Sequence, residues 1–200
     1  MKHHSHLFPV TLQTLWSSSV NTDNDSVHEG LRDWLFATGS LTARLKTHCT
    51  EFRVEVLGQE IIACSELEAN DDIAVDEQVL VREVLLYCDN KPQVFARSLL
   101  PLKSLTGEEQ SLAKLGEQPL GQVLFNHPDL IRKGIEVACF KQSSALFTLI
   151  KQLDLPTTAV WGRRSVFVLN NKPIMVAEVF LPESFAYELI SETRAAQLIE

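Results

Sequence analysis

Two pairs of apolar, strand-length segments, each joined by a tight turn, constrain the fold of this chain more than any other feature. QVLVREVLLY and QVFARSLLP flank the turn DNKP at 89–92, and WGRRSVFVL and IMVAEVFLP flank the turn NNKP at 170–173. Short turns rich in Asn and Asp join neighbouring strands into β-hairpins. Successive hairpins favour an antiparallel sheet with its helices gathered at one side. The sequence therefore predicts an α+β fold.

The length and charge of the chain limit its organisation and its partners. Its 200 residues suit one domain, which we predict over 26–190, between a poorly ordered segment at 1–25 and a tail at 191–200. The net charge of −8 argues against a nucleic-acid surface, and no apolar run is long enough to span a bilayer. The four cysteines are scattered, without zinc-ligand spacing or a signal peptide, which predicts free thiols in a cytoplasmic protein.

Several helices and loops are expected around the hairpins. Apolar residues over 31–35 have helical spacing, and Ser40 is placed to cap a second short helix. Thr106 and Glu109 resemble the capping box of a third helix. The acidic, irregular segment 64–78 predicts a solvated loop.

Three more segments differ in how clearly they can be interpreted. Alternating apolar residues from Phe52 onwards predict a half-buried strand, and 130–140 predicts another. Residues 141–158 fit either a helix or an insertion. The opening MKHHSH could bind a metal through its histidines, but a solvated tail is the simpler interpretation.

Glu178 is a carboxylate on an otherwise apolar strand face. Such a group is desolvated unless it is paired, and burial raises its pKa. If the asparagines at 170–171 are the central residues of the turn, Arg163 lies directly opposite Glu178, whereas a slip of one residue places Arg164 there. The sequence leaves open whether such a pair is structural or faces a ligand.

Arg82 and Arg97 are cations on apolar faces of the first hairpin. A two-residue turn would place them opposite each other, which is unfavourable unless an anion lies between them. Alternatively, Glu83 or Glu178 neutralises them, or the register differs. Because an acidic protein that binds an anion must gather a few arginines in one place, this pattern favours an anion site.

Six segments occur in the order and approximate spacing of one enzyme family: VREVLLY, VFARSLLP, SLTG, LGEQPLGQVLF, WGRRSVFVLNNKP and AEVFLP. Over residues 30–188 the chain resembles the chorismate pyruvate-lyases. The resemblance implies a six-stranded antiparallel sheet with flanking helices and an internal site closed by two helical flaps. It also implies a monomeric enzyme, without metal or cofactor, that cleaves chorismate to 4-hydroxybenzoate and pyruvate in the first committed step of ubiquinone biosynthesis.

The resemblance also implies which residues bind the substrate. The arginine that binds the substrate carboxylate falls on Arg82, and the carboxylate that meets the hydroxyl falls on Glu178. A main-chain contact from one flap falls on Leu120, and a contact from the other flap falls near Leu41. A Met is usual at the position of Leu41, but a backbone contact would tolerate the change, and Leu is a similar apolar wall.

Two details of the chemistry and one rival function stay open at the level of sequence. Arg97 or Arg163 could bind the enolpyruvyl carboxylate, and Glu178 could accept a hydrogen bond from the ring hydroxyl or act as a general base. The rival is a non-catalytic sensor of small aromatic acids, or a 4-hydroxybenzoate carrier, with the same fold. Transcription regulators of this kind need a basic helix-turn-helix, and the N-terminal region is short and insufficiently basic.

Overall fold

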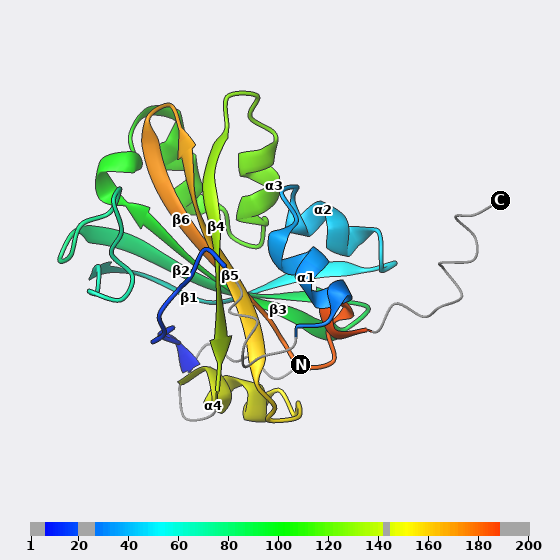
Figure 1. Cartoon of the computed structure of the whole chain (residues 1–200). Helices are drawn as coiled ribbons and strands as arrows, with labels where there is room; N and C mark the ends of the chain where they lie inside the picture. The colour runs from blue at the N-terminus through cyan, green and yellow to red at the C-terminus, as the bar shows by residue number, and fades with distance from the viewer. Residues whose placement is uncertain (1–6, 20–26, 142–144, 189–200) are drawn as a thin grey trace.

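The computed structural model describes residues 7–19, 27–141 and 145–188. Six antiparallel strands form one sheet in the order β1-β2-β3-β6-β5-β4 (Figure 1). The α+β class and the six-stranded sheet are therefore confirmed. The strands are β1 (Phe52–Ala63), β2 (Gln78–Cys88), β3 (Lys91–Pro101), β4 (Ile131–Phe140), β5 (Val160–Leu169) and β6 (Lys172–Phe180).

Both predicted hairpins are present, and their turn residues explain why they form. The β2–β3 turn contains Asp89 and Asn90, and the β5–β6 turn contains Asn170 and Asn171. All four residues have a positive φ, between 47° and 64°. That is the conformation of a type I′ turn, which Asn and Asp adopt more readily than other residues with a side chain. The two hairpins meet where β3 pairs with β6, so together they form the four central strands.

Helices cover the sheet, and the two predicted near the N-terminus are present. The Oγ of Ser40 accepts the N–H of Ala43 at 3.3 Å, which confirms Ser40 as a cap. None of the helices in the described ranges has the length and apolar content needed to cross a bilayer. The helices are α1 (Glu29–Phe36), α2 (Leu41–Lys46), α3 (Leu120–Phe125) and α4 (Ala145–Gln152), with short 3-10 helices η2 (Leu102–Ser104), η3 (Gly107–Lys114) and η4 (Phe185–Tyr187).

The predicted capping box at Thr106 is wrong. The Thr106 side chain makes no capping hydrogen bond, and η3 is a 3-10 helix. Glu109 instead reaches the turn of the second hairpin, where it accepts hydrogen bonds from Lys172 and Asn170. These bonds, that of Lys172 first, lower the pKa of Glu109 to about 2. A tertiary ion pair has therefore replaced the local cap.

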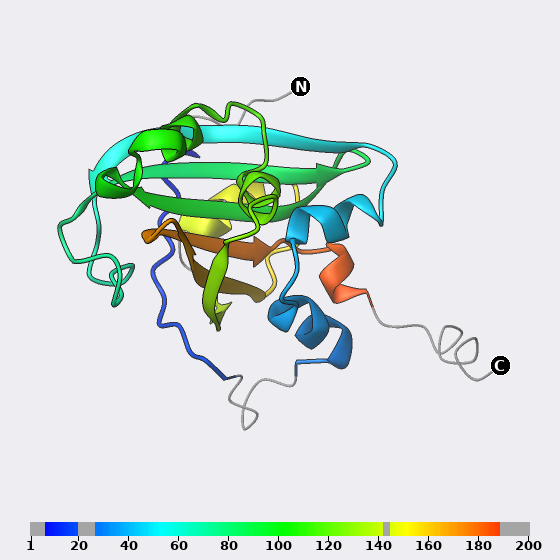
Figure 2. The ribbon, with the colours of Figure 1, turned by 90° about the horizontal axis from the view of Figure 1, so that it is seen from above.

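The sheet separates two apolar layers. On the face that carries Glu178, α1 and α2 pack at one end and α3 and η3 at the other, around two separate clusters. Figure 1 shows α1, α2 and α3 together on one side and α4 apart from them. The opposite face is covered by α4 and the N-terminal segment. Figure 2 shows that segment, in dark blue, running beside the strands.

Two stretches expected to be poorly ordered or solvated are packed instead. In 7–19, Val10 and Leu12 are buried. The supposedly solvated loop 64–78 buries Ile73 and Glu68, so its description as a purely solvated loop is wrong. The N-terminal histidines and the tail at 191–200 lie outside the described residues. No disulfide is found at any of the four cysteines, as predicted.

Candidate active site

One row of residues across the sheet carries the candidate site. Arg82 on β2 pairs with Ser98 on β3, and Ser98 pairs with Val176 on β6. Val176 in turn pairs with Ser165 on β5. Directly paired residues point to the same face, and with strands about 4.8 Å apart the row spans about 14 Å. Glu178 lies two residues along β6 on this same face. Apart from Val176 these residues are polar, and they form a polar strip that crosses the sheet between the two apolar clusters.

Arg82 is a buried cation with no carboxylate partner among the described residues. It is 2% exposed, and its Nη2 donates to the backbone carbonyls of Gly116 at 2.9 Å and Gln118 at 3.0 Å. Within the described ranges, no acceptor meets its Nε or Nη1. Burial lowers the pKa of Arg82, because the charged form loses its contact with water. This is the state expected of an arginine that receives an anionic ligand.

Glu178 and Arg163 form an ion pair, as the turn-based register predicted. The two residues pair directly across β5 and β6, and Arg163 Nε donates to Glu178 Oε2 at 2.7 Å. Arg163 Nη1 also donates to the carbonyls of Trp34 at 2.9 Å and Ala37 at 2.8 Å. Arg163 therefore holds both the Glu178 side chain and the end of α1 in place. The Glu178 side chain keeps 17% of its surface exposed, and its Oε1 meets no donor among the described residues.

Arg164, the alternative partner for Glu178, belongs to the other face. Its Nε donates to Glu136 Oε2 at 2.7 Å, and its guanidinium lies over the ring of Trp16. The alternative register, shifted by one residue, is therefore excluded. The Arg164–Glu136 pair offers a matched control for substitutions at the site.

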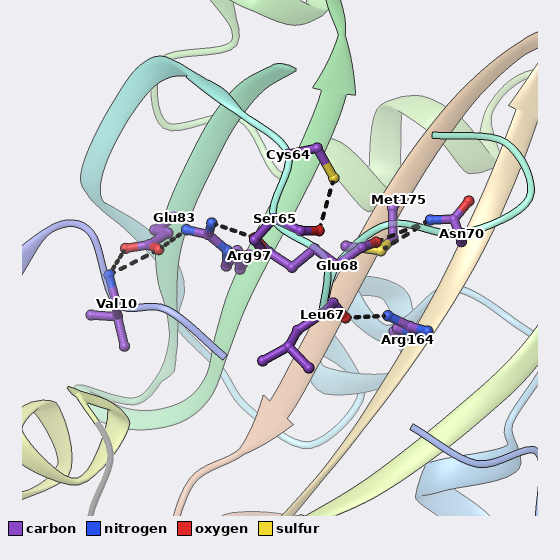
Figure 3. Close-up of polar contacts among 10 residues, drawn as sticks. All are labelled: Val10, Cys64, Ser65, Leu67, Glu68, Asn70, Glu83, Arg97, Arg164 and Met175. Carbon is purple, nitrogen blue, oxygen red and sulfur yellow. Dashed lines mark hydrogen bonds and ion pairs between the residues drawn. The ribbon is translucent and has the colours of Figure 1, made fainter. Parts of the chain in front are cut away.

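Arg97 lies on the opposite face from Arg82, so the prediction that the two arginines face each other is wrong. The β2–β3 pairing shifts by one residue shortly before the turn, which sets Arg82 opposite Ser98 and Arg97 opposite Glu83. Figure 3 shows the Arg97 guanidinium between two carboxylates. Its Nε donates to Glu68 at 2.6 Å, and its Nη1 donates to Glu83. The neutralisation of Arg97 by Glu83 was the alternative that the sequence left open.

This buried cluster occupies Arg97 completely. The N–H of Val10 also donates to Glu83 Oε2, at 2.8 Å (Figure 3). Burial raises the pKa of Glu83 despite these bonds. Burial alone would lower the pKa of Arg97, but the hydrogen bonds and charges of Glu68 and Glu83 outweigh it and raise that pKa. Arg97 thus serves the core of the opposite layer and is withdrawn as a candidate for the enolpyruvyl carboxylate.

Leu41 and Leu120 begin the two helices that flank the polar strip. Leu41 is the first residue of α2 and Leu120 the first of α3, and both are buried. N–H groups in the first turn of a helix have no partner within the helix, so they are available to a ligand. Lys46 Nζ donates to Gln122 Oε1 at 2.8 Å and ties α2 to α3. The two leucines therefore occupy equivalent positions on two connected helices.

Arg132 is a polar residue of the site that sequence reasoning missed. It is paired with Phe167 on β5, and its Nε donates to Ser165 Oγ at 2.8 Å. Its pKa is lowered to about 10, by burial first and then by the charge of Arg163. The β4–β5 register is irregular around Gly134, which has a φ of 55°. Simple alternation along β4 therefore could not assign Arg132 to this face.

Solved structures with a similar fold include two bacterial proteins. PhnF from Mycobacterium smegmatis has a TM-score of 0.53 at 15% identity, over 73% of this chain and 65% of that chain. A transcriptional regulator of the GntR family from Bacillus cereus has a TM-score of 0.51 at 16% identity, over 70% and 99% of the two chains. At such low identity this similarity shows the fold alone.

Sequence comparison is more specific. The family described as "Chorismate lyase" matches residues 11–190. A "Probable chorismate pyruvate-lyase" of Psychromonas ingrahamii is 42% identical over 183 residues, which cover 90% of this chain and 96% of the relative. A "Chorismate pyruvate-lyase" of Pectobacterium atrosepticum is 35% identical over 160 residues, covering 80% and 81%. The resemblance seen in the sequence is thus confirmed, and the chain belongs to the chorismate lyase family.

Proposed function

We propose that this chain cleaves chorismate to 4-hydroxybenzoate and pyruvate, in the cytoplasm and as a monomer, as the first committed step of ubiquinone biosynthesis. The observation that carries the proposal is that one sheet face holds both a buried arginine and a carboxylate oxygen that lack ionic partners among the described residues. Arg82 offers its positive charge and the two N–H groups of Nη1 to the ring carboxylate, while its Nη2 stays bonded to the carbonyls of Gly116 and Gln118. Glu178 offers Oε1 to the ring hydroxyl.

The reaction needs little from the protein beyond position and charge. The bond between the ring carbon and the ether oxygen breaks, and the enolpyruvyl fragment becomes pyruvate. The hydrogen on the hydroxyl-bearing ring carbon moves to the methylene carbon of the departing fragment, which becomes the methyl group of pyruvate. The ring becomes aromatic, and no electrons are gained from or lost to another molecule. Holding the ether side chain over that hydrogen is therefore the main catalytic task.

Glu178 acts in this scheme as a hydrogen-bond acceptor. Its Oε2 is held by Arg163 Nε at 2.7 Å, and this contact fixes the direction of the carboxylate. The free oxygen can orient the ring hydroxyl and thus set the position of the neighbouring ring carbon. Backbone N–H groups at Leu41 and Leu120 supply further contacts from the two flaps.

Turnover of chorismate is the direct test. The purified protein should release 4-hydroxybenzoate and pyruvate in equal amounts, without added metal and equally in the presence of EDTA. Absorbance of 4-hydroxybenzoate and a coupled assay for pyruvate measure the two products. Tight binding of 4-hydroxybenzoate with no turnover would contradict the proposal and favour the sensor or carrier.

Glu178→Gln should lower kcat about tenfold. Glutamine keeps an acceptor oxygen but loses the charge, and the difference between a charged and a neutral hydrogen bond is about 1–1.5 kcal/mol. Loss of a general base would instead lower kcat by about a hundredfold or more. Glu136→Gln, on the opposite face, should leave kcat unchanged.

An isotope measurement separates the two roles independently of the rate. Chorismate deuterated at the hydroxyl-bearing ring carbon should deliver its deuterium to the methyl group of pyruvate, as detected by mass spectrometry. Wash-out of the deuterium into water would show that a protein base removes it, and would contradict the acceptor role of Glu178.

A further inference from the structure

We propose that Arg132 binds the enolpyruvyl carboxylate of the substrate, an inference that rests on the proposed chorismate cleavage. Chorismate carries two carboxylates, and Arg82 accounts for only one of them. The enolpyruvyl carboxylate needs a second cation. That cation must lie near Glu178, because the enolpyruvyl group is attached to the ring carbon next to the one that bears the hydroxyl.

The Arg132 guanidinium lies on the sheet face that carries Arg82 and Glu178. Its Nε donates to Ser165 Oγ at 2.8 Å, and the Ser165 hydroxyl donates in turn to the carbonyl of Gly134 at 2.9 Å. The guanidinium also lies over the ring of Phe167, with its central carbon 5.1 Å from the ring centroid. Ser165 ends the row that begins at Arg82. Arg82 and Arg132 therefore stand at opposite ends of the same polar strip.

The hydrogen bonds of Arg132 leave one nitrogen for a ligand. Its Nη1 donates to the carbonyls of Ala37 at 3.1 Å and Thr38 at 3.2 Å, in the loop between α1 and α2. Among the described residues no acceptor meets Nη2. Because Nε and Nη1 fix the plane of the guanidinium, the direction of the Nη2 donors is fixed as well. A site with oriented donors of this kind suits a carboxylate.

The other two candidate arginines have their charges neutralised. Arg163 is bonded to Glu178, and Arg97 is bonded to two carboxylates on the opposite face. No carboxylate is hydrogen-bonded to Arg132 among the described residues, although Glu178 is close enough to influence its charge. The four charged side chains along the strip, those of Arg82, Arg132, Arg163 and Glu178, thus have a net charge of +2. That charge matches a substrate with two carboxylates.

Burial and the nearby Arg163 both disfavour the charged form of Arg132, and they lower its pKa to about 10. Arg132 is still protonated at neutral pH, so the site holds a cation that an anionic ligand would stabilise. The same reasoning applies to Arg82, whose pKa burial also lowers. At both ends of the strip, the cation has no hydrogen-bonded carboxylate among the described residues.

Substrate and product together test this assignment, because 4-hydroxybenzoate lacks the enolpyruvyl group. Arg132→Met should lower kcat/KM for chorismate about thirtyfold or more. The Kd of 4-hydroxybenzoate, measured by calorimetry or fluorescence, should change by less than about threefold. Arg82→Met should weaken both ligands. Arg132→Lys should recover part of the loss for chorismate, because it restores the charge but not the fixed direction of the Nη2 donors.

The possible outcomes separate three cases. If Arg132→Met weakened 4-hydroxybenzoate as strongly as chorismate, Arg132 would serve only to anchor the loop at Ala37 and Thr38, and the inference would be overturned. Unchanged kinetics for chorismate would overturn it as well. Failure of the unaltered protein to cleave chorismate would refute the proposed function itself. Arg164→Met, on the opposite face, should leave both measurements unchanged.

Discussion

Replacing Arg82 by methionine should lower kcat/KM for chorismate by about 10²–10³-fold. Removal of one partner from a buried, hydrogen-bonded charge pair typically costs about 2–5 kcal/mol of binding, and each 1.4 kcal/mol is a factor of ten. Arg82 is the cation best placed for the ring carboxylate, because its Nε and Nη1 meet no acceptor within the described ranges and it is 2% exposed. Steady-state kinetics with chorismate measure the loss.

The same substitution should leave the free energy of unfolding unchanged or raise it. Among the described residues, the buried Arg82 charge meets two acceptors, the carbonyls of Gly116 and Gln118. A methionine fills similar space without a charge to desolvate, and such replacements are often neutral or stabilising. Urea denaturation followed by circular dichroism measures this. A loss of both activity and stability would mean that Arg82 holds the loop before α3 and that its effect on catalysis is indirect.

The two hairpins show how far sequence can determine this site. In the second hairpin an unbroken register follows from the Asn170–Asn171 turn, and it placed Arg163 opposite Glu178 correctly. In the first hairpin the turn was equally clear, but a one-residue shift between Leu86 and Tyr87 reversed the expected pairing of Arg97. Such a β-bulge arises from tertiary packing as well as local sequence. Counting residues from the turn therefore predicts the wrong strand pairing beyond such a bulge.

The other errors of sequence-based prediction concern residues whose burial depends on partners far away in the sequence. Glu68 belongs to an acidic segment that resembles a solvated loop, and only the position of Arg97 on the folded sheet shows why it is buried. Val10 contacts Glu83 across 73 residues of sequence. Arg132 was overlooked because the irregularity near Gly134 changes which face it occupies. In each case the deciding contact joins segments that the sequence pattern treats separately.

Replacing Arg97 by methionine should destabilise the protein by about 3–5 kcal/mol. The substitution leaves Glu68 and Glu83 buried without their common cation, and the loss of one member of a buried ion-pair cluster typically has this magnitude. Denaturation in urea at pH 8 measures it. Arg164→Met is the matched control, because its partner Glu136 keeps 41% of its side chain exposed, and such pairs contribute at most about 1 kcal/mol.

The destabilisation by Arg97→Met should shrink as the pH falls from 8 to 5. Burial already raises the pKa of Glu83 in the unaltered protein, and loss of the guanidinium raises it further. A carboxyl whose pKa is higher in the folded state than in the unfolded state binds more protons when folded, so lowering the pH stabilises the fold. Arg164→Met should show no comparable change with pH. A loss that stayed constant across this range would mean that the two carboxylates are not left buried as anions, and that Arg97 supports the fold through packing alone.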